Sequence, residues 1–141
     1  MRSSVVSFRD LKVWQLGMDL AVEVYSATRI FPASERFGLC SQMQRASVSI
    51  PSNVAEGHAR REGAYLNHVK IALGSQAELG TEVELALRLG YLSSEKAESL
   101  VSDIDRVRQL LFGLKRSLER ERQSTVVAVT TLVILMGAVL F

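Results

Sequence analysis

The stretch from Phe37 to Gly57 constrains the fold most, because its residues favour a helix and yet include a proline. Pro51 has no N–H to donate to the carbonyl of Ser47, and its ring crowds that carbonyl. In an exposed helix interior such a break costs about 3 kcal/mol. The short polar side chains of Ser47 and Asn53 are able to bond freed backbone groups. The sequence therefore predicts a kinked helix, held by the packing of its apolar residues.

Three further segments show the spacing of helices that bury one face. Apolar residues recur every three or four positions between residues 11 and 30, where Pro32 ends the pattern, and again over residues 62–89. Between residues 97 and 118 the spacing is that of a heptad seam. Its members are Ala97, Leu100, Ile104, Val107, Leu111, Leu114 and Leu118. Because short links join the segments, we expect an all-α fold, an antiparallel up-down four-helix bundle over residues 1–123.

Two details of this bundle follow from the same patterns. The first helix is expected to bury one stripe, made of Leu11, Trp14, Met18, Ala21, Tyr25 and Thr28. The second helix is expected to end near Gly57, since glycine suits the left-handed conformation of a helix C-terminal cap.

The last segment, residues 124–141, differs from the rest of the chain. From Thr125 to Phe141 its 17 residues carry no charge and show no single apolar face. As a helix they reach about 25 Å, slightly less than a hydrocarbon core of about 30 Å. Positive charges precede them at Lys115, Arg116, Arg120 and Arg122, as on the cytoplasmic side of a membrane segment. The segment predicts a C-terminal membrane anchor. The alternative is a tail that is buried in a bundle or an oligomer channel, or that is disordered when no membrane is present.

The overall composition narrows the class of protein. With 48% hydrophobic and 23% charged residues, the chain has the composition of a folded domain rather than of a disordered one. A net charge of +2 is too small to indicate nucleic-acid binding by itself. Residues 1–7 contain no apolar signal-peptide core, so we expect a cytoplasmic protein, attached to the inner face of the membrane if the tail is an anchor.

No arrangement of residues predicts catalysis. His58 and His68 lie ten positions apart, without cysteines or paired carboxylates at metal-ligand spacing, so no metal site is predicted. The glycines are isolated, and no phosphate-binding loop or other cofactor motif follows them. We therefore expect a protein that is not an enzyme and holds no cofactor.

A basic set near the second interhelical turn is the best candidate for a binding site. Its members are Arg45, His58, Arg60, Arg61 and Lys70. If they form one surface, phosphate contacts would give salt-dependent, sequence-independent binding of nucleic acid. The alternative is that Arg45 pairs with Glu35 or Glu56 and that the others are ordinary surface charges.

Several short motifs together resemble one bacterial family. They are Phe31-Pro32, Phe37-Gly38-Leu39, Arg45-Ala46, Ser49-Ile50-Pro51, Asn53, Ala55-Glu56-Gly57, Leu11-Lys12-Val13-Trp14 and Leu89-Gly90-Tyr91-Leu92. Over about residues 8–118 the chain resembles the four-helix bundle protein family, also called the 23S rRNA intervening-sequence protein family. The resemblance implies up-down bundles that assemble as homopentamers around a central channel.

The resemblance also bears on function. Some relatives resemble accessory proteins of diversity-generating retroelements, which bind nucleic acid and a reverse transcriptase through a basic surface. By this resemblance Arg45, Arg60 and Arg61 fall in the basic part of the motif. We therefore expect a non-enzymatic, homo-oligomeric scaffold or adaptor that binds RNA, DNA or a nucleic-acid enzyme. The alternative is a structural or protein-interaction module tethered to a membrane through residues 125–141, without nucleic-acid binding.

Overall fold

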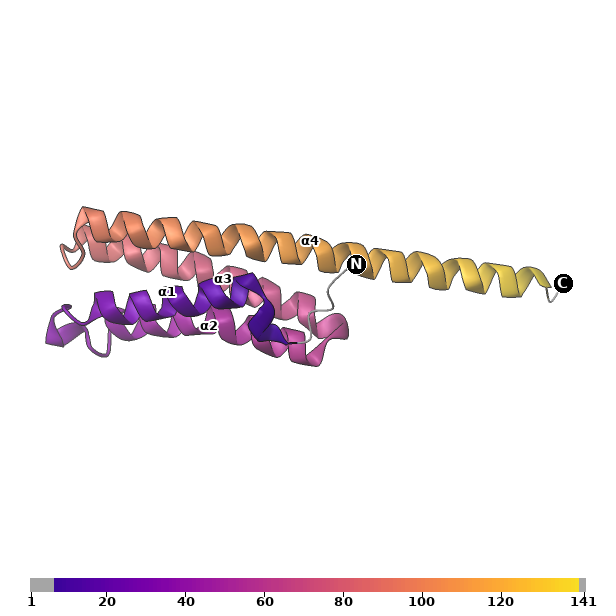
Figure 1. Ribbon diagram of the computed structural model, residues 1–141, viewed down its shortest axis with the longest axis horizontal. Helices are drawn as coiled ribbons and strands as arrows, with labels where there is room; N and C mark the ends of the chain where they lie inside the picture. Colours follow the sequence, from indigo (N-terminus) through magenta and orange to yellow (C-terminus); the bar gives the residue numbers. More distant parts are fainter. Residues whose placement is uncertain (1–6, 140–141) are drawn as a thin grey trace.

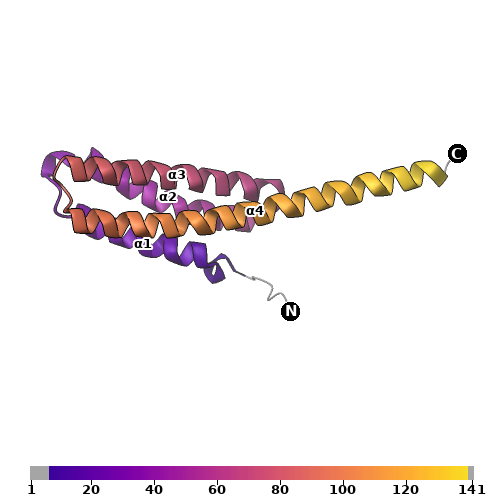
Figure 2. The same cartoon turned by 90° about the horizontal axis from the view of Figure 1, so that it is seen from above.

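The computed structural model describes residues 7–139 of the chain. Within that range it contains α-helices and two short 3-10 helices, and no strand. The elements are η1 (Phe8–Asp10), α1 (Lys12–Thr28), η2 (Ala33–Glu35), α2 (Leu39–Arg60), α3 (Glu62–Arg88) and α4 (Ser94–Val139). Successive helices run in opposite directions and lie side by side, and α4 projects far beyond the other three (Figures 1 and 2). The predicted all-α four-helix bundle is confirmed.

The core lies between the four helices and contains the predicted heptad seam. Five of its members are buried: Ala97, Leu100, Ile104, Val107 and Leu111. They meet Leu20 and Val24 of α1, Met43, Ile50 and Val54 of α2, and Val69, Leu79 and Val83 of α3 in one apolar cluster. Leu114 and Leu118 are only partly buried, because the bundle ends there.

The buried face of α1 differs from the predicted stripe. Met18 and Tyr25 are 41% and 46% exposed, whereas Leu20 and Val24 are buried. Both sets satisfy helical spacing, so periodicity alone did not choose between them. The structure turns Gly17 inward: a Cβ built on Gly17 would lie 3.4 Å from Cβ of Pro51. The smallest residue of α1 therefore lies where α2 carries its proline.

Helix α2 continues through Pro51 without a break. Two nearby side chains bond the backbone: Ser47 Oγ donates to the carbonyl of Gln44 at 2.8 Å, and Asn53 Nδ2 donates to that of Ser49 at 2.9 Å. Neither of these bonds reaches the Ser47 carbonyl that the proline leaves without its donor. The kink itself stays a prediction, and what accompanies Pro51 is its burial against Gly17.

Gly57 does not have the role predicted for it. Helix α2 runs on to Arg60, and the residue with positive φ at its end is Arg61, at 48°. Gly57 instead permits a close approach of α3, because a Cβ there would lie 2.7 Å from Cδ2 of Tyr65 and 2.9 Å from Cβ of His68. Arg61 alone separates α2 from α3.

The apolar tail is a direct continuation of α4. This helix contains 46 residues and is about 69 Å long at 1.5 Å per residue. We call its projecting part, residues 120–139, the α4 extension; every side chain from 120 to 136 is exposed. Within the described part of the chain, no helix is long and apolar enough to cross a membrane. The end of the predicted anchor, residues 137–141, lies outside the described side chains.

Candidate functional site

A row of polar contacts joins α2 to α3. The hydroxyls of Ser49 and Ser75 lie 2.8 Å apart, and Nδ1 of His68 lies 2.9 Å from Oδ1 of Asn53. His68, Ser75 and Glu82 are seven residues apart on α3 and so share one face. These directional contacts fix the register of the two helices up to their turn.

Glu82, at the far end of this row, has no such contact. Its Oε2 is buried without a hydrogen-bond partner among the described residues. Burial, together with the smaller effect of the nearby Glu78 carboxylate, raises the pKa of Glu82 to about 7. The fold therefore favours the protonated carboxyl, and this group makes stability depend on pH.

The turn between α2 and α3 brings together some members of the predicted basic set. Nη2 of Arg60 lies 2.7 Å from Oε1 of Glu56, and Nε2 of His68 lies 3.8 Å from the same oxygen. Arg60 is therefore exposed but already paired. Arg61 is exposed beside it in the one-residue link.

His58 does not belong to the exposed set. It is only 9% exposed, and its ring packs edge-on against that of Tyr65, with centroids 5.9 Å apart. The Tyr65 hydroxyl is buried without a partner among the described residues, and burial raises its pKa to about 12. The two aromatic rings close the end of the core rather than present charge to a ligand.

Arg45 lies away from the turn. It is exposed, and it precedes Arg60 by fifteen residues, or about 22 Å along the helix. Neither acid expected as its partner pairs with it. Glu56 bonds Arg60, whereas the Glu35 carboxylate accepts from the backbone N–H of Leu39 at 2.9 Å and from the hydroxyl of Tyr91 at 3.2 Å.

Lys70 lies in a surface hollow together with a cation that was absent from the predicted set. The hollow is lined by Leu66, Lys70, Glu119, Arg122, Gln123, Val126 and Val127, where α3 runs beside the start of the α4 extension. The sequence identifies Arg122 only as one of the positive charges that precede the apolar tail. No local signal places it beside Lys70, because that proximity depends on the antiparallel packing of α3 and α4.

These side chains define a cationic region, which we call the basic end. It comprises Arg60, Arg61, Lys70, Arg120 and Arg122, at the end of the bundle from which the α4 extension departs (Figures 1 and 2). One neighbouring acid, Glu119, is paired with Lys115 at 3.1 Å. Among the side chains that the structure describes, those of Arg61, Lys70, Arg120 and Arg122 form no ion pair within 4.0 Å, which leaves them free to contact an anionic partner.

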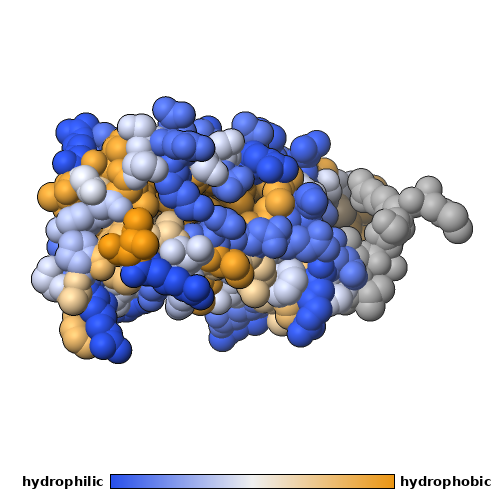
Figure 3. All heavy atoms as spheres, turned by 60° about the vertical axis from the view of Figure 1, so that its left-hand side comes forward, coloured by the Kyte–Doolittle hydropathy of each residue, from blue (hydrophilic) through white to orange (hydrophobic). Residues whose placement is uncertain are grey.

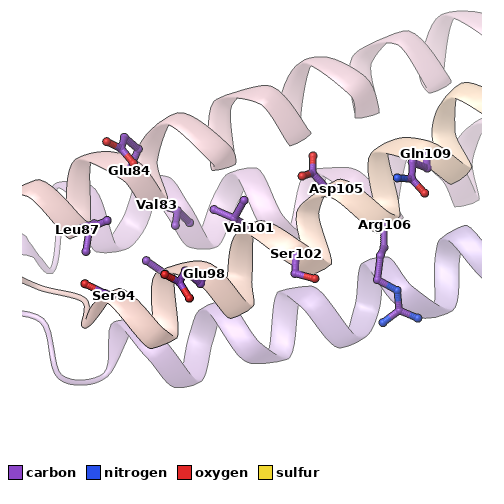
Figure 4. Close-up of a pocket in the computed structure, with 11 residues that line it drawn as sticks. Val83, Glu84, Leu87, Ser94, Glu98, Val101, Ser102, Asp105, Arg106 and Gln109 are labelled. Carbon is purple, nitrogen blue, oxygen red and sulfur yellow. The ribbon is translucent and has the colours of Figure 1, made fainter.

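A second hollow, between α3 and α4 near their connecting turn, has a different character (Figure 4). Val83, Leu87 and Val101 contribute apolar surface, and the acids at its edge are partly paired. Glu84 bonds Arg88 at 2.7 Å, and Asp105 bonds Arg108 at 3.1 Å. Neither histidine lines it. Over the described residues, no three His, Cys, Asp or Glu side chains are placed to hold a metal ion.

Known proteins resemble this chain at the level of family and fold. The family model of the 23S rRNA-intervening sequence protein matches residues 9–113. A crystal structure of a protein of unknown function from the S23 ribosomal protein family of Bacteroides thetaiotaomicron superposes with a TM-score of 0.69 at 24% identity. The match covers 74% of this chain and 95% of that one, and shows a shared fold. Among curated proteins, none matches the sequence.

Proposed function

We propose, from the premise that the chain belongs to the 23S rRNA-intervening sequence protein family, that it is a non-enzymatic, homo-oligomeric scaffold that binds nucleic acid through its basic end. The observation that carries this proposal is the gathering of Arg61, Lys70, Arg120 and Arg122 at one end of the bundle. They come from the α2–α3 link, α3 and α4, so a single partner is able to contact three parts of the fold.

Phosphate groups are the ligands that suit these side chains. A guanidinium offers a planar fork of donors to phosphate oxygens, and a lysine ammonium offers a point charge. Few aromatic residues lie exposed near them, so contacts with bases are not the expected source of affinity. With about four phosphates neutralised, the logarithm of affinity should fall against the logarithm of salt with a slope of about −3 to −4.

An enzyme that acts on nucleic acid is the protein partner that we propose beside it. A reverse transcriptase is the candidate suggested by the resemblance to retroelement accessory proteins. In this role the bundle supplies a rigid body that holds nucleic acid and enzyme together, and needs no reactive group of its own.

The direct test is fluorescence anisotropy with labelled RNA, single-stranded DNA and duplex DNA over a salt series. The double variant Arg61→Ala, Lys70→Ala should weaken binding at least tenfold and make the salt slope shallower by about 2, because two phosphate contacts are lost. The matched control is Arg29→Ala with Arg36→Ala, which removes two exposed cations from the opposite end. No binding at low salt, or equal losses in both double variants, would refute the proposal.

The alternative function is a membrane-tethered module without nucleic-acid binding, placed on the cytoplasmic face. It is favoured by the bare apolar side chains of the α4 extension, and opposed by the shortness of that run relative to a bilayer. Flotation of the full chain with phosphatidylcholine vesicles, together with absent affinity for RNA and DNA, would favour this alternative.

A further inference from the structure

The α4 extension exposes apolar surface on all of its sides. Eight large apolar side chains between residues 126 and 136 are 56–65% exposed: Val126, Val127, Val129, Leu132, Val133, Ile134, Leu135 and Met136. By contrast, the bundle surface in Figure 3 mixes hydrophobic and hydrophilic side chains. Soluble monomers rarely leave such a continuous apolar patch bare, and a helix that is apolar all round is normally buried.

We infer that the α4 extensions of at least three copies of this chain pack in parallel around a common axis. The inference rests on the proposed homo-oligomeric scaffold and identifies the element that assembles it. The occupant of the bare surface is thus the same segment of other copies.

The first argument for a second copy is continuity with the bundle seam. The heptad positions of Leu111 and Leu118 continue at Thr125 and Leu132, and those of Leu114 continue at Glu121, Ala128 and Leu135. Beyond the polar residues Glu121 and Thr125, the apolar residues Ala128, Leu132 and Leu135 therefore stand at the same heptad positions as the seam within the bundle. Sustained heptads are the pattern with which helices pack side by side at small angles.

The second argument is that the segment is already suited to burial. No charged residue lies between 125 and 136, so identical copies approach there without electrostatic repulsion. Its polar side chains are satisfied within the helix. Thr125 Oγ1 donates to the carbonyl of Glu121 at 3.0 Å, and Thr130 and Thr131 donate to carbonyls four residues earlier at 2.9 Å. Burial among other helices leaves none of these hydroxyls without a partner.

Charge placement favours parallel copies. In an antiparallel pair, Arg120 and Arg122 of one copy would lie against the apolar far end of another, which would cost desolvation without a partner. In a parallel assembly apolar residues meet apolar residues. The residues Glu119, Arg120, Glu121 and Arg122 alternate in sign, so each arginine at the base of the extension has an acid next to it in the same copy.

The apolar surface on all sides of the α4 extension sets the minimum number of copies. Two helices in contact cover one seam each and leave their opposite sides in water. Three or more are needed before each extension has neighbours on two sides. A standard interface buries about 800 Å² per partner, and eight large side chains, each more than half exposed, supply apolar surface of that order.

Parallel packing would also bring the basic ends of all copies together around the common axis. Lys70 and Arg122 line a hollow at the base of the extension, so each copy brings its hollow close to the common axis. The cations of all copies would then form one ring facing the same way. A single strand of nucleic acid contacting several copies gains affinity through effective concentration, without any new type of contact.

The test is the mass of the full-length protein by light scattering in detergent-free buffer. We expect at least three times the chain mass of 15.6 kDa for the wild type. The double variant Leu132→Glu, Leu135→Glu should fall to the mass of one chain, since charges would then line the shared seam. Circular dichroism should show that it keeps its helices, because neither residue contributes to the core.

The matched control places two glutamates on the bundle surface instead. Val22→Glu with Leu89→Glu changes residues that are 65% and 50% exposed, and its mass should equal that of the wild type. Orientation is tested with Ser124→Cys in a Cys40→Ser background, which in a parallel assembly forms a disulfide between copies on oxidation. A wild type that is monomeric in buffer, a Leu132→Glu, Leu135→Glu variant that keeps the full mass, or no cross-link at residue 124 would overturn the inference.

Three outcomes separate this inference from the membrane alternative and from the proposed nucleic-acid binding. A chain that is monomeric in buffer and floats with phosphatidylcholine vesicles overturns it in favour of a bilayer as the occupant. If the assembly forms as expected but binds neither RNA nor DNA, the inference holds and the nucleic-acid part of the proposed function fails. If the monomeric variant binds nucleic acid as tightly as the wild type, the proposed function survives and the predicted contribution of the ring is wrong.

Discussion

The two halves of α4 belong to one helix and carry leucines at the same heptad positions, but they have opposite surroundings. Leu100, Ile104 and Leu111 in the first half are almost fully buried, whereas Leu132 and Leu135 in the second are 58% and 59% exposed. The difference lies in the neighbours: α1 and α3 cover the first half, whereas among the described residues α3 reaches the second half only at its base, where Leu66 and Lys70 share a hollow with Val126 and Val127. A heptad pattern therefore predicts that a helix has a partner, and does not say whether that partner belongs to the same chain.

The largest expected difference between the two halves is in the free energy of unfolding. Leu111→Ala should lower it by about 2–5 kcal/mol, because it leaves a cavity in the core. Leu132→Ala should change it by less than about 0.5 kcal/mol at concentrations where the chain is monomeric. Urea denaturation followed by circular dichroism measures both. Equal losses would mean that the extension folds back onto its own bundle.

Two glycines sharpen the contrast between close and open packing. Gly57→Ala should destabilise the bundle by about 1–3 kcal/mol, because the added Cβ meets the Tyr65 ring and the backbone-linked Cβ of His68. Gly113→Ala in α4 should instead stabilise it by up to about 1 kcal/mol, since no atom lies within 4 Å of the new Cβ. Thermal unfolding of both variants measures the difference. A stable Gly57→Ala protein would contradict the close approach of α2 and α3.

Glu82 gives the bundle a pH dependence that the extension, which has no acid beyond Glu121, does not share. Burial raises the pKa of Glu82 from 4.5 to about 7. The contribution of its protonated carboxyl to the free energy of unfolding is therefore fully present below pH 4.5 and is lost as the pH rises through 7. Glu82→Gln should therefore raise the free energy of unfolding by roughly 1–2 kcal/mol at pH 8 and change it little at pH 4.5. Denaturation at both pH values measures this, with the exposed Glu121→Gln as control. An equal gain at both pH values would show that ionisation is not the cause.

The smallest effect is expected at the junction of the two halves. Lys115 and Glu119 form an i,i+4 pair at 3.1 Å near the last contacts of the bundle. Lys115→Ala should cost about 0.3–0.5 kcal/mol and less in high salt, because salt screens pairs that are partly exposed to solvent. Comparing urea midpoints at low and high salt tests this. A larger loss that salt does not reduce would mean that the lysine stem contributes through packing.

Sequence periodicity predicted the helices and the seam of α4, because each depends on residues close together in the chain. It did not predict the face of α1, where the inward position of Gly17 depends on Pro51 of another helix. Gly57 was misread for the same reason: its small size serves contacts with Tyr65 and His68 rather than a helix end.

The residues of the basic end divide in the same way. Arg60 and Arg61 were predicted to lie together because they are adjacent in sequence, and the pairing of Arg60 with Glu56 is local as well. His58 was included in the predicted basic set although it is buried against Tyr65. Its burial depends on how α3 folds back, which the sequence near His58 does not show. Arg122 was missed because only the packing of α3 beside α4 brings it to the hollow that contains Lys70.

The absence of a break within α4 has a mechanical consequence. The helix continues from the bundle through residue 139 without a proline or an interruption. The extension of twenty residues thus acts as a stiff spacer of about 30 Å. A partner bound at the far end of the extension is held at that distance from the bundle. A rotation of that end about the helix axis would be transmitted to the part of α4 that packs in the core.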